Sequence, residues 1–394
     1  MKPDDIPSQA ERLKQVRRVA IVAGETSGDY IAAKLLESLR RRWPNAVFEG
    51  IAGPRMQAQG CESLFPMERL AVMGITEVFG RLWELLLARR RLIRYWQKQP
   101  PDVFIGVDAP AFNMGLAHAL KKRGMKTVHY VSPTVWAWRP GRIHHIGKSV
   151  NLMLTLFPFE TDIYCKHHIP VHFAGHPLAD EIELRTPAEP ARRMLELPLA
   201  GPVLALLPGS RGSEIRNLAS DFFNAAERVS RRMDNLSVVV AVADAKYLDM
   251  LRHIHKQHSP TLAIRYITDR TREVIAAADV VLTASGTATL ETMLIKRPMV
   301  VAYRLASSTY WLARRLVTAP FIAMPNLLAN QRMVPEFVQH NVNPENLASA
   351  LVKQFEAGSK ERIQQIFTDI HTSLRQNASE SAADAVVSLL GVQV

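Results

Sequence analysis

The chain has 394 residues, of which 47% are hydrophobic and 22% are charged. These values are ordinary for a globular protein and exclude a disordered or fibrous chain, and the length predicts two or three domains. Lysine and arginine number 49 against 37 acidic residues, which gives a formal net charge of +12. Such an excess favours an anionic partner: a nucleic acid, an anionic membrane surface or a phosphorylated substrate.

Cysteine usage and apolar patterning predict the compartment. The two cysteines, Cys61 and Cys165, lie too far apart in the sequence for a disulfide framework, so we expect a reducing environment. No run reaches the roughly 18 uninterrupted apolar residues of a spanning helix. The polar start MKPDDIPSQAERLKQVRR also lacks the apolar core of a signal peptide. We therefore expect a cytoplasmic chain that is able to lie on a membrane.

Short β-rich apolar runs alternate with longer helical stretches, which is the pattern of a parallel α/β sheet. In the first half, helices are expected from Ile31 and Phe112, and the expected strands are 18–23, 47–51, 103–107 and 127–131. In the second half the expected strands are 203–207, 237–241, 262–266, 280–283 and 299–302.

A proline-bearing stretch separates these two series of strands, with prolines at Pro177, Pro187, Pro190, Pro198 and Pro202. Two separate series predict an α/β fold with two Rossmann-like, doubly wound parallel-sheet domains. The expected boundaries are a polar extension at 1–16, a first domain at 17–178, a linker at 179–201, a second domain at 202–345 and C-terminal helices at 346–394. The expected closing helices are 347–356, 360–374 and 379–390.

The clearest local signal is the segment TASGTATLE, residues 283–291, at the end of an expected strand. Its small residues Ser285, Gly286 and Thr287 would present free backbone amides to a diphosphate at the start of a helix. Glu291 follows Thr287 by four residues, so it lies on the same helical face and can accept hydrogen bonds from ribose hydroxyls. The alternative is a plain serine N-cap.

A second glycine-bearing loop, LLPGSRGSE at 206–214, follows the strand that opens the second series. The guanidinium of Arg211 suits a pair of phosphate oxygens. The alternative is a structural ion pair between Arg211 and Glu214.

Two strand ends in the first half also carry polar groups. The loop AGETSGD at 23–29 has glycines that admit a ligand, but two acids there would oppose a dinucleotide, and a capped turn is the alternative. Asp108, followed by a proline at position 110, is either a general base facing a cleft or a turn-forming residue. Because no HExxH and no DxD motif occurs, we assign no metal.

The stretch around residues 74–96 has an amphipathic pattern. On a helical wheel one broad face carries Ile75, Val78, Phe79, Leu82, Trp83, Leu85 and Leu86, and four arginines follow between positions 89 and 94. We expect an interfacial helix in which Val78, Phe79, Leu82 and Leu86 dock on a membrane. The alternative is a core helix with a basic end.

Taken together, these segments resemble the lipid-A-disaccharide synthase family from about residue 17 to 390. The resemblance is carried by AGETSGD at 23–29, AGPRMQAQGCE at 52–62, LAVMGITEVFGRL at 70–82, PDVFIGVDAPAFN at 101–113, HYVSPTVWAWR at 129–139, FAGHPLAD at 173–180, LLPGSRGSE at 206–214, SGTATLE at 285–291 and MPNLLA at 324–329.

The resemblance implies a GT-B glycosyltransferase of Gram-negative lipid A biosynthesis that needs neither metal nor cofactor. It implies a UDP-2,3-diacylglucosamine donor held by the second domain, and a 2,3-diacylglucosamine 1-phosphate acceptor held by the first. The products would be the β(1→6)-linked disaccharide 1-phosphate and UDP, made at the cytoplasmic face of the inner membrane, whose anionic surface is a further expected partner.

The resemblance also implies residue roles. Asp108 matches the general base, Arg211 the diphosphate contact and Glu291 the ribose contact. The further expected cleft or acceptor residues are Gly24, Glu25, Ser27, Asp29 and Asn326.

Rival functions make different demands on the sequence. A UDP-sugar epimerase would share the fold and the UDP site, but it has no reason to bind diacyl lipids. A basic nucleic-acid-binding protein would explain the charge, yet no reading helix, RNA-binding aromatic signature or zinc spacing occurs, so we expect no nucleic acid. The sequence leaves open a homo-oligomer and the acyl-chain lengths.

Overall fold

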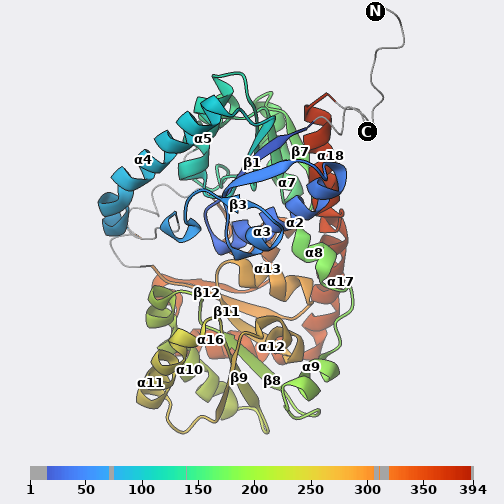
Figure 1. The fold of residues 1–394 in the computed structure, drawn as a ribbon. Helices are drawn as coiled ribbons and strands as arrows, with labels where there is room; N and C mark the ends of the chain where they lie inside the picture. Colours follow the sequence, from blue (N-terminus) through green and yellow to red (C-terminus); the bar gives the residue numbers. More distant parts are fainter. Residues whose placement is uncertain (1–15, 71–74, 139, 306–309, 311–318, 392–394) are drawn as a thin grey trace, which may run out of the picture. The chain divides into compact units, whose positions relative to one another are not determined.

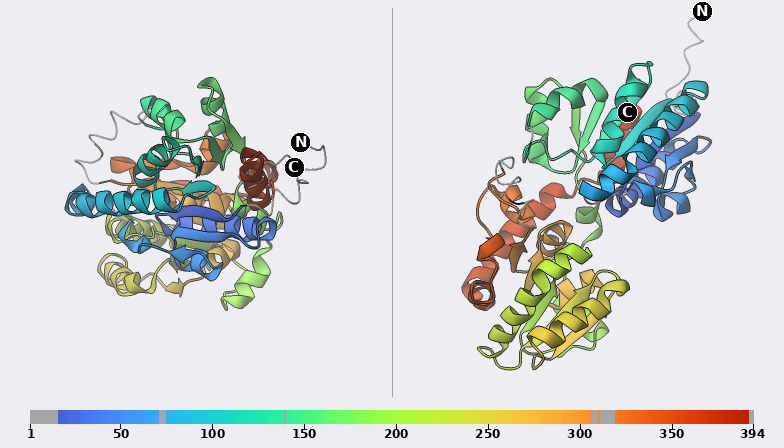
Figure 2. Two further views of the ribbon diagram at one scale, coloured as in Figure 1. Left: turned by 45° about the horizontal axis from the view of Figure 1, so that its top comes forward. Right: turned by 90° about the vertical axis from the view of Figure 1, so that its left-hand side faces the viewer.

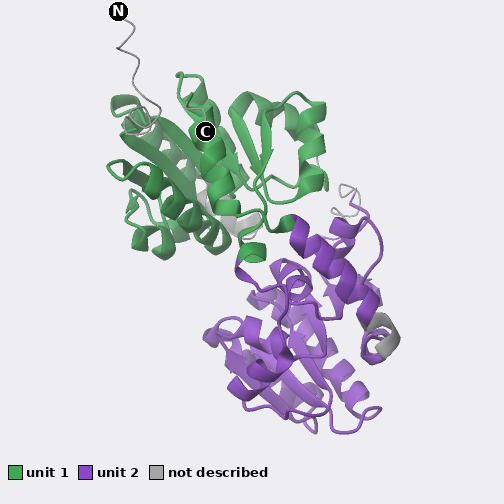
Figure 3. Ribbon diagram, turned by 90° about the vertical axis from the view of Figure 1, so that its right-hand side faces the viewer, with its two compact units in different colours: residues 1–180, 374–394 green, residues 181–373 purple. Residues whose placement is uncertain are grey.

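The computed structural model describes residues 16–70, 75–138, 140–305, 310 and 319–391, without the side chains of 75–82 and 357–360 (Figure 1). The chain divides into two compact units (Figure 3). Unit 1 comprises Met1–Asp180 and Leu374–Val394, and unit 2 comprises Glu181–Ser373.

Unit 1 is built on a parallel seven-stranded sheet with the order β3-β2-β1-β4-β5-β6-β7. Its strands are β1 (Arg18–Ala23), β2 (Val47–Ile51), β3 (Glu62–Ser63), β4 (Val103–Val107), β5 (Lys126–Tyr130), β6 (Leu152–Thr155) and β7 (Val171–Phe173). The chain runs outward from β1 to β3 and then returns to the other side of β1 at β4. The loops after β1 and β4 therefore lie at the switch point where ligands bind in such sheets.

The helices of unit 1 cover both faces of this sheet (Figures 1 and 2). They are α2 (Thr26–Arg42), α3 (Pro54–Ala58), α4 (Ile75–Lys98), α5 (Pro110–Lys121), α6 (Ile143–Ser149), α7 (Pro158–Lys166), α8 (Pro177–Glu181) and α18 (Ala378–Leu389), with 3₁₀ turns η2 (Met67–Arg69) and η3 (Pro140–Arg142). Helix α4 packs beside α5, and α18 packs beside α2.

The core of unit 1 includes residues from the end of the sequence. Every residue of β4 is buried, as expected for a parallel strand covered on both faces. Ala382 and Val386 of α18 belong to the same apolar cluster as the strands. Ion pairs also join α18 to α2: Arg42 of α2 pairs with Glu380 of α18 at 2.7 Å and also with Asp384 of α18.

Unit 2 has a parallel six-stranded sheet with the order β10-β9-β8-β11-β12-β13. Its strands are β8 (Val203–Leu207), β9 (Ser237–Val242), β10 (Ile264–Thr268), β11 (Val280–Ala284), β12 (Met299–Tyr303) and β13 (Glu336–Val338). The order reverses beside β8, so the switch point of this sheet lies at the loops after β8 and β11.

The helices of unit 2 are α9 (Ala188–Met194), α10 (Gly212–Ser230), α11 (Leu248–His258), α12 (Thr271–Ala277), α13 (Thr287–Leu294), α15 (Met324–Ala329), α16 (Pro344–Phe355) and α17 (Ala357–Leu374), with 3₁₀ turns η4 (Ala245–Tyr247) and η5 (Gln339–Asn341). Helix α16 packs on α10, and α9 packs on α12.

Two expected segments are organised differently in the structure. The expected linker 179–201 carries α9, and its buried Arg192 donates to Ala277 O at 3.0 Å and Asp279 Oδ2 at 2.8 Å, which ties the segment into unit 2. The expected block of C-terminal helices is divided: α16 and nearly all of α17 belong to unit 2, and α18 belongs to unit 1.

Candidate functional site

The switch point of unit 2 carries a cavity of about 410 Å³. The register places Leu207 of β8 beside Thr283 of β11, so the loops that follow these strands are neighbours. All the residues expected to bind the donor line this cavity: Arg211, Ser285, Gly286, Thr287 and Glu291. The structure therefore brings these two sequence segments together at one site.

Arg211 lies in the loop between β8 and α10. Gly209 of this loop has φ +128°, and a Cβ there would lie 2.5 Å from Cβ of Glu214, so the tight turn needs glycine. Glu214 accepts from the Ser210 amide at 3.0 Å and pairs with Arg211 at 3.5 Å. The pair is long and the Arg211 side chain is 52% exposed, so Glu214 leaves most of the guanidinium donors available to a ligand.

The start of α13 offers backbone amides to the same cavity. Its N-cap is Gly286, with φ 131°, and no side chain caps the helix. The hydroxyl of Ser285 donates instead to the Ile322 carbonyl at 3.1 Å. The serine N-cap considered as an alternative is therefore absent, and the first turn of α13 is a site suited to an anion.

Glu291 lies one turn into α13 and is held by Arg272, a residue outside the motifs that predict the donor site. Arg272 of α12 donates through Nε to Glu291 Oε1 at 3.0 Å and contacts Glu181 at 3.2 Å. The Glu291 side chain is 17% exposed. Arg272 thus orients the carboxylate at the edge of the cavity while one of its oxygens stays available.

The switch point of unit 1 carries Asp108. Ala23 of β1 and Val107 of β4 are paired, which places Asp108 beside the loop after β1. Asp108 and Ala109 both have positive φ, at 51° and 42°, and such a left-handed non-glycine residue costs about 1–3 kcal/mol. Burial raises the pKa of the Asp108 carboxyl, although the Ala109 amide and the Ser27 hydroxyl, both bonded to the carboxylate, partly oppose the rise.

Asn113 supports this strained turn from α5. It is fully buried and donates to the Asp108 carbonyl at 2.8 Å and the Val22 carbonyl at 3.2 Å. The side-chain amide therefore joins the ends of β1 and β4 beneath Asp108. Its position within the segment PDVFIGVDAPAFN was the available sequence signal.

The remaining residues of the 24–29 loop divide into two groups. Gly24 is buried against Ala109, the Ser27 hydroxyl reaches Asp108, and Glu25 is the half-buried N-cap residue of α2. Asp29 is 1% exposed, and its two oxygens accept from the amides of Arg55 and Met56 at 3.0 and 3.1 Å. Asp29 thus caps α3, and its carboxylate is occupied by the protein itself.

Asn326 lies in unit 2 and is also occupied. It is fully buried, donates to Glu336 Oε1 at 2.8 Å and Val334 O at 2.9 Å, and accepts from the amides of Met333 and Val334. These bonds use its full capacity and join α15 to the start of β13.

A buried carboxyl supports the segment 132–138 after β5. Glu160 is 4% exposed, accepts from the Phe157 amide at 3.2 Å, and interacts with Ser132 and Trp136. Burial raises the pKa of Glu160 to about 8, and these donors oppose the rise. The aromatic segment 132–138 is therefore anchored by an internal network.

Helix α4 presents an unusual outer face. Trp83 is 65% exposed and Leu87 is 37% exposed, whereas Ala88, Leu92 and Trp96 are buried. The exposed residues Arg90, Arg91 and Arg94 continue the face of Trp83 and Leu87. Leu86 is half-buried, and the side chains of Val78, Phe79 and Leu82 lie outside the described residues. Within the described ranges, no helix is long and apolar enough to cross a membrane.

No group of three or more His, Cys, Asp or Glu residues is placed to hold a metal ion in the described part of the chain.

The two Rossmann-like sheets, each with polar residues at its switch point, define a GT-B protein. The fold is similar to that of the S. aureus MnaA–UDP co-structure, with a TM-score of 0.67 and 12% identity over 95% of this chain and 97% of that chain. It is also similar to the glycotransferase of kitacinnamycin, with a TM-score of 0.64 and 16% identity over 95% and 99%.

Sequence comparison identifies the family within this class. The model of the lipid-A-disaccharide synthetase family matches residues 19–389, and the chain belongs to this family. The lipid-A-disaccharide synthase of Azotobacter vinelandii is 50% identical over 375 residues, which span 95% of this chain and 98% of that protein. The protein is therefore a glycosyltransferase of lipid A biosynthesis.

Proposed function

We propose that the protein joins UDP-2,3-diacylglucosamine to 2,3-diacylglucosamine 1-phosphate, which gives the β(1→6)-linked disaccharide 1-phosphate and UDP. The observation that carries this proposal is that one cavity of unit 2 is lined by Arg211, the start of α13 and Glu291 together. A cavity of about 410 Å³ lies within the range of small-molecule sites.

The donor contacts follow from the chemistry of this cavity. The amides at Gly286 and Thr287 and the guanidinium of Arg211 bind the diphosphate, and Glu291, oriented by Arg272, accepts from the ribose hydroxyls. As the bond to UDP breaks, negative charge grows on the diphosphate. Donors that are already in place stabilise that charge, and one such contact is typically worth about 3–4 kcal/mol of the barrier.

Asp108 is the proposed general base. A β product from an α-linked donor requires inversion at the anomeric carbon, so a single displacement suffices. The acceptor 6-hydroxyl oxygen attacks that carbon, its proton passes to the Asp108 carboxylate, and UDP leaves with the electrons of the broken bond. The raised pKa of Asp108 makes its carboxylate a stronger base, and its strained turn holds it in place.

The outer face of α4 is the proposed contact with the lipid phase. Trp83 and Leu87 give it apolar area, and Arg90, Arg91 and Arg94 add charge that an anionic surface attracts. This arrangement would attach the enzyme at the cytoplasmic face of the inner membrane.

The direct test incubates the purified chain with both diacyl substrates and follows UDP release and the disaccharide by mass spectrometry. UDP release that requires both substrates, with a product of the summed mass minus UDP, supports the proposal. Incubation with soluble UDP-GlcNAc alone is the control. Epimerised UDP-sugar in that control, without disaccharide in the first reaction, would support the epimerase instead.

A further inference from the structure

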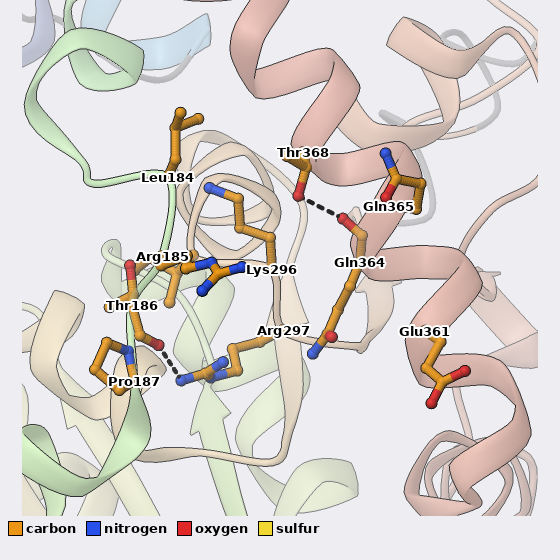
Figure 4. A pocket seen from close by; sticks show the side chains of 11 residues that line it. Leu184, Arg185, Thr186, Pro187, Lys296, Arg297, Glu361, Gln364, Gln365 and Thr368 are labelled. Carbon is orange, nitrogen blue, oxygen red and sulfur yellow. Dashed lines mark hydrogen bonds between the residues drawn. The ribbon is translucent and has the colours of Figure 1, made fainter.

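Unit 2 contains a second cavity, of about 560 Å³, which shares no lining residue with the donor cavity. Three segments form it: the chain before α9, the turn after α13, and α17 (Figure 4). Its lining includes Arg185, Lys296, Arg297, Glu361 and Gln364.

The turn after α13 carries two cations, Lys296 and Arg297, and the side chains of both bond to backbone carbonyls. Lys296 is 5% exposed, and its ammonium group contacts the carbonyls of Glu183 and Leu294 and the His371 ring nitrogen Nδ1. Arg297 donates to the carbonyls of Thr186 at 2.8 Å and Ala276 at 2.7 Å. No described carboxylate forms a hydrogen bond or ion pair with Arg297.

The positive charge of Arg297 is costly to bury. Burial lowers the pKa of the Arg297 guanidinium, with Asp279 giving only a partial opposing effect. The half-buried Arg297 guanidinium, which bonds only to backbone carbonyls, loses part of its hydration without the gain of an ion pair. An anion in the cavity would supply the missing partner.

Arg185 provides a further cation at the rim. It is exposed and forms no hydrogen bond or ion pair with any residue in the described ranges. In Figure 4 its guanidinium points into the space in front of Arg297, whereas the carboxylate of Glu361 points away. The amide of Gln364 faces the same space from α17 (Figure 4).

We propose that this cavity binds an anionic ligand that carries a phosphate or diphosphate group, at a site separate from the donor cavity. A planar guanidinium with free donors suits phosphate oxygens, and the volume suits a small phosphorylated molecule. The Arg185 guanidinium contacts the phosphate directly, Lys296 and Arg297 supply the field beneath it, and Gln364 adds a neutral donor.

The test is calorimetric titration of the full chain with pyrophosphate at low salt and saturating UDP, which occupies the donor cavity. We expect one pyrophosphate per chain. Arg185→Gln and Gln364→Glu should each weaken binding by about tenfold or more, since the first removes a charged contact and the second adds a like charge. Arg252→Gln, at an exposed arginine outside both cavities, is the matched control and should bind as the unmodified chain does.

Two arms identify the source of the phosphate. Displacement of pyrophosphate by phosphatidylglycerol vesicles, but not by phosphatidylcholine vesicles, assigns the site to a lipid headgroup, and no displacement assigns it to a soluble compound. All these positions are exposed, and thermal unfolding verifies that each variant is folded. Absence of binding at millimolar pyrophosphate, or equal affinity in every variant, would overturn the proposal.

Discussion

A Cβ atom on Gly24 would lie 2.4 Å from the Cβ of Ala109, a distance that carbon atoms in proteins do not tolerate. The loop after β1 therefore packs directly on the strained turn that carries Asp108. Gly24→Ala should push this turn outward and lower kcat by about tenfold or more, because the proposed base is then displaced from the acceptor hydroxyl. The affinity for UDP should not change, because the donor residues all lie in unit 2.

The matched control for Gly24→Ala is Gly141→Ala, since a Cβ on Gly141 meets nothing within 4 Å. Steady-state kinetics and UDP calorimetry on both variants provide the measurement. A Gly24→Ala enzyme with full activity would show that the turn does not depend on this contact.

Removing the proposed base is the second prediction. Asp108→Asn keeps the shape of the side chain but cannot accept the proton, so kcat should fall by about 10²-fold or more. In the unmodified enzyme, activity should decline as the pH falls through the pKa of Asp108, which burial places above its ordinary value of 3.8. The exposed Asp162→Asn is the control. Near-normal turnover of Asp108→Asn would show that Asp108 is not the general base, and Glu25 would be the next candidate.

The donor site gives the third prediction. Arg211→Ala and Glu291→Ala should each raise the Kd for UDP by about ten- to a hundredfold, because a charged hydrogen bond is often worth about 1.5–3 kcal/mol. Binding of the lipid acceptor should be unaffected. Arg216→Ala, an exposed arginine on α10 that does not line the cavity, is the control. Unchanged UDP affinity in both test variants, measured by calorimetry, would show that the donor does not bind at this cavity of unit 2.

The fourth prediction concerns attachment to lipid. Serine at Val78, Phe79, Leu82 and Leu86, or at the exposed pair Trp83 and Leu87, should weaken partition onto anionic vesicles by about tenfold or more. High salt should also release the unmodified protein, because the arginines of α4 act through charge.

The control for this prediction is Met194→Ser with Leu199→Ser, two exposed apolar residues of unit 2. Vesicle sedimentation and circular dichroism report binding and folding. Activity on detergent-dispersed substrate should largely survive in the α4 variants. If those variants unfold, the replaced residues belong to the core, and α4 is not a docking helix.

The fifth prediction follows from the buried carboxyl of Glu160. The folded protein keeps this proton up to a pKa of about 8, whereas the unfolded chain releases it near 4.5. The free energy of unfolding should therefore fall as the pH rises between these values, by up to about 1.4 kcal/mol per pH unit. Glu160→Gln should remove this slope in urea unfolding, whereas the exposed Glu189→Gln should retain it. An unchanged slope in Glu160→Gln would mean that the carboxyl is ionised in the folded state.

The longer strands could be predicted because burial on both faces leaves a continuous apolar run. The bounds expected for β1, β2, β4 and β8 agree with the structure. Leu262 was expected to begin a strand, but its amide closes a turn onto Ser259 and β10 begins at Ile264. Short strands such as β6 and β13 were missed, since three or four residues hold no periodic signal and owe their state to neighbouring strands.

The candidate site could be predicted only in part, because the local sequence does not show which distant group a polar side chain contacts. The local sequence around a polar residue in a glycine-rich loop is the same whether its partner is a ligand or a distant amide of the protein. Asp29 finds amides on α3, and Asn326 finds the segment before β13, so both are satisfied by the fold. Arg272 donates to the Glu291 carboxylate and Asn113 to the Val22 carbonyl, both distant in sequence, and no local pattern indicates such partners.

The division of the C-terminal helices has a consequence for synthesis on the ribosome. Residues 181–373, which intervene between the two parts of unit 1, take about 10–40 s to translate at typical rates. During that time the apolar surface that Ala382 and Val386 later cover stays open to chaperones, while unit 2 is a single continuous stretch. The unit that emerges first is therefore the last to be completed.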